Sequence, residues 1–240
     1  MEFEIVYIFD LIMGIFCLIA GFYLLMNAIK SQKKVLISFS VYFLAVSLSL
    51  FLIFIYVAFP SLSVTYGHFI VFLAILIASL GVLALLLGTY YINSTLSRPI
   101  TIFELFLTVM LLFLILILYP VNVGSLGNQG QNLTIFYSLL LFVAYLIPYI
   151  FCILNLLGLN VNTSGYTKST VRNLIIFFSL SIVLTFGKIT SFFTIDINNT
   201  AFNFSFMDSL VVLLLIQIFL VVYSIPINSE KKFMLKISNR

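Results

Sequence analysis

Four ionisable side chains lie near one end of separate apolar stretches, and they are the first candidates for chemistry: Asp10, His68, Lys188 and Asp208. A helix rise of about 1.5 Å per residue puts Asp10 and Lys188 each about 7–8 Å inside that end, with His68 and Asp208 close to it. Because a charge within hydrocarbon is costly, such groups generally pair inside a helix bundle. We predict an outer-leaflet polar cluster in which Lys188 pairs with Asp10 or Asp208, beneath an outward-facing vestibule.

The alternative interpretation is that these side chains are four separate boundary residues. A lysine near the end of a membrane helix can extend its ammonium group to the membrane surface. An aspartate at the start of a helix, which is the predicted position of Asp208, can cap that helix. A lone histidine at a helix start, such as His68, fits a hydrogen-bonded boundary residue.

Glu104 is a fifth ionisable residue, predicted about 6 Å inside the opposite, cytoplasmic end of its helix. The nearest cation in the sequence lies six residues away, too far for a contact across one helical turn. We therefore predict an ion pair with Arg172 or Lys168 and interpret it as structural; a proton or cation relay is the alternative. Asn155 and Gln217 are buried amides, for which we predict interhelical hydrogen bonds.

Several kinds of site are excluded by residue type and spacing. The single histidine excludes bis-histidine haem, and no set of His, Cys and Glu has the spacing of a zinc site. No metalloprotease, nucleophile-elbow or phosphate-loop motif occurs. Cys17 and Cys152 lie in apolar segments at different depths, which excludes a disulfide framework. We expect no cofactor, no metal and no enzymatic activity.

Composition indicates the class of protein. Hydrophobic residues make up 63% of the chain and charged residues 8%, against roughly 45–50% and about 25% in soluble domains. This balance excludes a soluble domain and a disordered chain, and it indicates a membrane protein. The net charge of +4 is dispersed in short clusters and forms no basic face, so no contact with nucleic acid is expected.

A membrane-spanning helix needs about 20 mostly apolar residues. We predict one all-α transmembrane domain, residues 1–240, with seven spans: 5–28, 35–59, 68–92, 100–119, 133–157, 174–193 and 206–225. Continuous apolar runs without alternation favour helices over a barrel. The first run follows acidic residues and lacks a positive leading region, so we expect an anchor and no cleaved signal.

Lysine and arginine predict the orientation of these spans, because they accumulate on the cytoplasmic side. With seven spans, ten of the eleven cations fall on one side of the membrane. The opposite side carries Glu2, Glu4 and Asp196 instead. We predict a multi-pass protein of the plasma membrane, with its N-terminus outside and its C-terminus in the cytoplasm.

Small residues recur every seven positions on two predicted helices: Gly14 and Gly21 on the first, and Ala74, Gly81 and Gly88 on the third. Small residues let helix backbones approach closely in lipid, so we predict helix-packing seams. The alternative is chance, because glycine is common in membrane helices. Pro148, inside the fifth span, predicts a kink or hinge and frees the Ala144 carbonyl.

Three classes of function fit these features. The preferred one is a non-enzymatic component of a membrane transport or translocation system, within a larger complex. The second is a seven-helix sensor or receptor that signals through a separate cytoplasmic partner, and the third is a structural or assembly subunit of a membrane complex. The expected partners are the lipid bilayer and other membrane subunits or a cytoplasmic protein.

Overall fold

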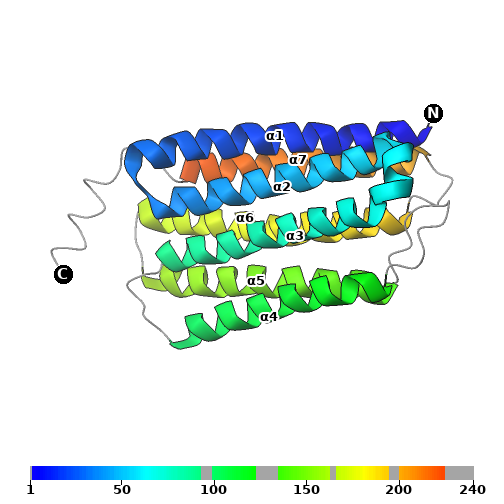
Figure 1. Cartoon of the computed structure of the whole chain (residues 1–240). Coiled ribbons are helices and arrows are strands. Elements are labelled where there is room, and N and C mark those ends of the chain that lie inside the picture. Colours follow the sequence, from blue (N-terminus) through cyan, green and yellow to red (C-terminus); the bar gives the residue numbers. More distant parts are fainter. Residues whose placement is uncertain (1, 93–98, 123–134, 163–165, 195–199, 225–240) are drawn as a thin grey trace.

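The computed structural model of the chain is an all-helical bundle (Figure 1). It describes residues 2–92, 99–122, 135–162, 166–194 and 200–224. Within these ranges seven helices follow one another: α1 Glu2–Ser31, α2 Lys34–Ala58, α3 Pro60–Ile92, α4 Pro99–Asn122, α5 Ile135–Asn162, α6 Tyr166–Thr194 and α7 Thr200–Ser224. Consecutive helices alternate in direction, as Figure 1 shows. The predicted all-α class is confirmed.

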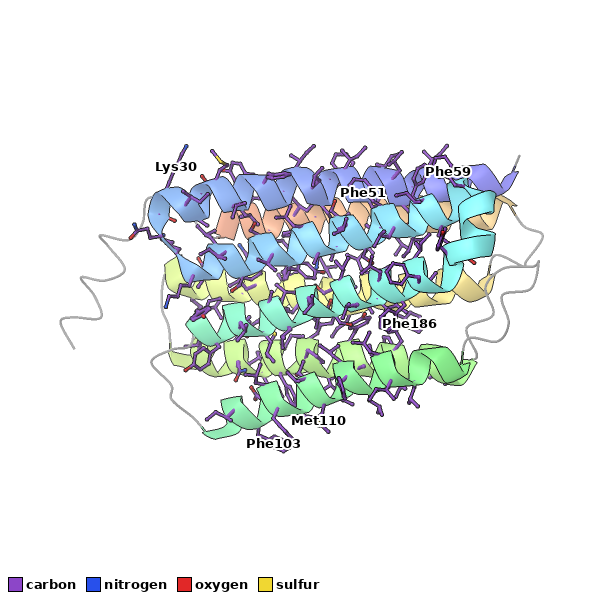
Figure 2. All side chains as sticks on the ribbon, viewed as in Figure 1. Lys30, Phe51, Phe59, Phe103, Met110 and Phe186 are labelled. Atoms are coloured by element: carbon purple, nitrogen blue, oxygen red, sulfur yellow. The ribbon has the colours of Figure 1, made fainter. Side chains whose placement is uncertain are left out.

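Five of the helices are long and apolar enough to cross a membrane, over Ile8–Ser31, Lys34–Tyr56, Phe69–Ile92, Leu139–Leu159 and Lys168–Gly187. α4 and α7 contribute shorter described apolar stretches, Ile102–Leu118 and Ser209–Val222. Large apolar side chains cover the outside of the bundle; on α4, for example, Phe103 and Met110 point away from the other helices (Figure 2). Such a surface suits hydrocarbon as its solvent.

The helices extend beyond the predicted spans, and one predicted connection was wrong. The segment 60–67 is the start of α3 and not a loop. A proline in the first helical turn costs little, because its missing N–H would have no helical partner there. Likewise α6 begins at Tyr166, ahead of its predicted span. Hydrophobicity measures the part of a helix that lipid would surround, whereas the backbone hydrogen bonds continue into more polar turns.

Small residues on one face of α2 meet the glycines of α1. A Cβ atom added at Gly14 would lie 2.8 Å from Phe51 Cε1, and one at Gly21 would lie 2.7 Å from Leu44 Cγ. Ser47 Oγ donates a hydrogen bond of 2.8 Å to the Gly14 carbonyl, and Ser40 Oγ donates one of 2.8 Å to the Gly21 carbonyl. The two backbones can approach this closely because neither glycine has a side chain.

The opposite side of α2 meets α3 in the same way. A Cβ atom added at Gly81 would lie 3.0 Å from Ala45 Cβ, and one at Gly88 would lie 3.0 Å from Ser38 Cβ. Ala74, one heptad before Gly81, is buried. α2 is therefore clamped between α1 and α3 through small residues on two of its faces.

The helices form a closed ring with one helix outside it. In the described part of the chain, α1, α2, α3, α5, α6 and α7 each contact the next, and α7 returns to α1. Within the described residues, α4 lies directly beside α3 and α5 and beside no other helix. Aromatic side chains from α2 and α6 meet in the centre of the ring, where the Phe39 and Phe177 rings lie 5.4 Å apart, edge to face. A single apolar core results.

The glycine contacts give a matched test of the α1–α2 packing. Gly21→Ala is expected to cost about 1–3 kcal/mol, because the new methyl group overpacks against Leu44. Gly158→Ala serves as the control, because a Cβ there would meet no atom within 4 Å. That change should be neutral or should stabilise α5 by about 0.5–1 kcal/mol. Thermal unfolding in detergent, followed by circular dichroism, measures both, and equal effects of the two changes would contradict the close approach.

Candidate functional site

Asp10 is the one member of the predicted outer-leaflet cluster whose side chain the structure describes, and it is 2% exposed. His68, Lys188 and Asp208 belong to α3, α6 and α7, but their side chains lie outside the described set. α7 contacts both α1 and α6. The pairing of Lys188 with Asp10 or Asp208 stays a prediction.

The helix segments that carry Lys188 and Asp208 lie at one level. A Cβ atom added at Gly187, next to Lys188, would lie 2.6 Å from the side chain of Leu210, two residues after Asp208. The described backbone of α3, which carries His68, does not lie directly beside that of α1, α6 or α7. α6 and α7 therefore lie directly against each other beside the positions of Lys188 and Asp208.

Polar side chains at helical spacing along α5 face the interior of the bundle: Tyr145, Tyr149, Cys152 and Asn155. We refer to these four as the α5 polar row. The first three are buried, and Asn155 is partly buried. Ten residues separate its ends, so the row extends about 15 Å along the helix axis. Each member meets a polar side chain of another helix.

Tyr145 connects α5 to α3. Its hydroxyl lies 3.1 Å from Ser79 Oγ, and it also donates a hydrogen bond of 3.3 Å to the Ile75 carbonyl. Ser79 Oγ donates to the same carbonyl at 2.8 Å. Farther along, Thr89 Oγ1 lies 3.6 Å from Cys152 Sγ. These contacts satisfy hydroxyl groups that would be costly to leave unpaired in lipid.

Asn155 connects α5 to α4 through the buried acid. Its Nδ2 donates a hydrogen bond of 2.9 Å to Glu104 Oε2, and Glu104 is 5% exposed. The interhelical hydrogen bond predicted for Asn155 is confirmed. Arg172 and Lys168 are exposed. The contact of Glu104 in the described part of the chain is thus with an amide, and its ion pair with Arg172 or Lys168 stays a prediction.

Tyr149 lies beside a second group of polar side chains, from α2, α6 and α7. The Tyr42 hydroxyl interacts with Tyr149, Ser181 and Gln217. Gln217 Nε2 donates to Ser181 Oγ and, at 3.4 Å, to the carbonyl of Phe177. The interhelical hydrogen bond predicted for Gln217 is therefore confirmed. Its Oε1 atom is buried without a hydrogen-bond partner among the described atoms.

A groove of about 160 Å³ separates α4 from α3 on the outside of the bundle. Its lining is apolar except for Ser79, which already bonds to Tyr145. α4 is therefore packed less completely on this side than the helices of the ring.

Pro148 lies within the α5 polar row, between Tyr145 and Tyr149, and α5 continues through it as one helix from Ile135 to Asn162. A proline removes one backbone hydrogen bond from a helix interior. Its role as a kink or hinge stays a prediction.

Of the α5 polar row, only Asn155 was predicted from the sequence to bond to another helix. The spacing of the other three residues could have indicated the row. Tyr145, Tyr149 and Cys152 recur at intervals of four and three residues, which places them on one helix face. Tyrosine in membrane helices concentrates at the two interfaces. Two tyrosines in the middle of a span therefore indicate a polar requirement inside the bundle.

The described side chains around the row can exchange hydrogen bonds and can neutralise a cation. They comprise hydroxyls, amides, a thiol and the Glu104 carboxylate. Among the described residues, no three His, Cys, Asp or Glu side chains form a group that could hold a metal ion. The arrangement is a set of buried and partly buried polar groups that bond to one another across helix interfaces.

A double-mutant cycle tests the contact between Glu104 and Asn155. Asn155→Leu is expected to cost about 0.6–2 kcal/mol, because it removes a hydrogen bond inside the membrane. In a Glu104→Gln background the same change should cost less, since a neutral amide is a weaker acceptor than a carboxylate. Arg172→Leu is the comparison: a larger coupling of Glu104 to Arg172 than to Asn155 would show that the ion pair is the dominant contact.

Comparisons with protein-family models, with curated proteins and with solved structures found no match to this chain.

Proposed function

We propose that the chain is a seven-span membrane protein that acts as a non-enzymatic component of a membrane transport or translocation system, within a larger complex. Five helices are long and apolar enough to cross a membrane, and the shorter apolar stretches of α4 and α7 support a count of seven. Lys30, Lys34, Lys168 and Arg172 lie near helix ends, and the alternating helix directions put those ends on one side of the bundle. Because lysine and arginine accumulate on the cytoplasmic side of a membrane, we place this side of the bundle in the cytoplasm and the protein in the plasma membrane.

The α5 polar row carries the proposal. Polar groups inside a membrane bundle are costly, and they commonly mark the routes of ions and substrates. The row and its partners occupy about 15 Å of depth, which is half of a hydrocarbon core about 30 Å thick. Glu104 lies five residues after the start of α4, and α4 begins at the end of the bundle where α1 ends (Figure 1). From Glu104, which Asn155 contacts, the row continues along α5 toward the middle of that helix.

Two other functions have some support. The closed helix ring, whose hydroxyl groups satisfy one another, favours an assembly subunit, which needs no route through the membrane. The buried Asp10, toward the other end of α1, suits a sensor that binds a ligand from outside and passes the signal to a separate cytoplasmic partner. These functions differ from transport in how the interior becomes accessible.

The two cysteines provide a test with an internal control. Cys17 is 0% exposed and Cys152 is 1% exposed, but only Cys152 belongs to the α5 polar row. A Cys17→Ser variant leaves Cys152 as the reacting thiol, and a Cys152→Ser variant leaves Cys17. Both variants are treated with a membrane-impermeant cationic thiol reagent. Right-side-out and inside-out vesicles expose opposite faces of the membrane. For transport we expect Cys152 to react from both sides, and faster than Cys17.

The remaining outcomes separate the alternatives. Reaction of Cys152 from the outer face alone would favour a sensor. Absence of reaction at both cysteines, or equal reaction of the two, would contradict a polar route along α5 and favour an assembly subunit. The reaction is measured by the mass shift of the intact protein. The experiment does not require the transported species to be known.

A further inference from the structure

We propose that Glu104, Thr108 and Asn155 form an intramembrane site for a monovalent cation, either H⁺ or Na⁺. Glu104 and Thr108 lie one turn apart on α4, and both are buried, at 5% and 0% exposure. Residues on the other side of the same helix, such as Phe103 and Phe106, are exposed to the surroundings. The two polar side chains therefore share the face of α4 that packs on α3 and α5.

Thr108 provides an observation independent of the carboxylate. Its Oγ1 is buried and has no hydrogen-bond partner among the residues that the structure describes. A threonine in a helix can bond to a carbonyl of the preceding turn, as Thr89 does with Leu86 at 2.8 Å. A buried hydroxyl without any partner is costly. An oxygen ligand for a cation beside Glu104 would remove that cost.

Charge also points to a cation. The described contact of Glu104 is the neutral amide of Asn155, at 2.9 Å. No described lysine or arginine is recorded in an ion pair with this carboxylate, and Lys168 and Arg172 are exposed. The Glu104 carboxylate carries one negative charge, and its neighbours Thr108 and Asn155 are neutral. A single positive charge therefore balances the site. A divalent ion would leave an excess charge in the hydrocarbon region.

The groups that face the site from the neighbouring helices are few. α5 contributes Asn155 and, one turn earlier, the titratable Cys152, which lies 3.6 Å from Thr89 of α3. The tyrosines at the end of α3, Tyr90 and Tyr91, are exposed. Glu104 is thus the acid in the described part of this region that can exchange a cation. As a coupling site the assignment rests on the proposed transport function, but cation binding itself does not.

A fluorescent hydrophobic carbodiimide tests binding without any transport measurement, because it modifies protonated carboxyl groups in membranes. The full-length protein is labelled in detergent and the modified residue is identified by mass spectrometry. We expect labelling at Glu104 that is lost in Glu104→Gln and retained in Asp10→Asn, which removes the other acid described as buried. For a sodium site, sodium chloride protects Glu104 while N-methylglucamine chloride does not. For a proton site, labelling falls as pH rises and sodium has no effect.

Thr108→Val tests the hydroxyl, since the two side chains have nearly the same shape. We expect it to shift the cation concentration for half-maximal effect by about tenfold, the loss of one hydrogen bond or ligand to a charged group. Labelling of Glu104 that depends on neither pH nor sodium would overturn the site. If Thr108→Val leaves the cation concentration for half-maximal effect unchanged, the proposed cation site would also be overturned. If Cys152 fails to react in vesicles while Glu104 binds a cation, the transport function fails and the site stands.

Discussion

Close backbone approach on two sides of α2 is the constraint on which the rest of the bundle depends. Ser40 and Ser47 lie on the face toward α1, while Ser38 and Ala45 lie on the face toward α3. Both pairs are seven residues apart, so each face keeps its register over two turns. Lipid supplies no hydrophobic drive between helices, and tight packing with hydrogen bonds to backbone carbonyls takes its place. On α2, the aromatic side chains of Phe39 and Tyr42 contact Phe177 of α6.

The polar groups inside the bundle are arranged by a similar requirement for hydrogen-bond partners. Hydrocarbon offers no hydrogen bonds, so hydroxyls and amides inside the bundle must find each other. Tyr145 with Ser79 meets this requirement between α5 and α3, and Gln217 with Ser181 meets it between the consecutive helices α7 and α6. Among the described residues, Asn27 Nδ2, Thr108 Oγ1 and Gln217 Oε1 are buried and do not meet it.

The sequence was sufficient for the helical class and for the residues that need partners. Apolar runs predicted the helices, and the amides Asn155 and Gln217 make the interhelical bonds expected of them. It was insufficient for the identity of partners, because that depends on which helices become neighbours. For Glu104 the contact with Asn155 of α5 was not predicted from the sequence, and its ion pair with Arg172 or Lys168 stays a prediction. The small residues of α2 were missed for the same reason: serine and alanine carry no signal until a facing glycine is known.

The contact between α7 and α1 has a consequence for biosynthesis. Helices enter a membrane in chain order, and the α1–α2–α3 unit can assemble as soon as its two turns are complete. The ring itself stays open until the last helix arrives, nearly two hundred residues after the first. During that interval the side of α1 that will meet α7 faces lipid or an insertion chaperone. Ring closure is therefore a late, long-range step, and the ring of helices is complete only after α7 packs against α1.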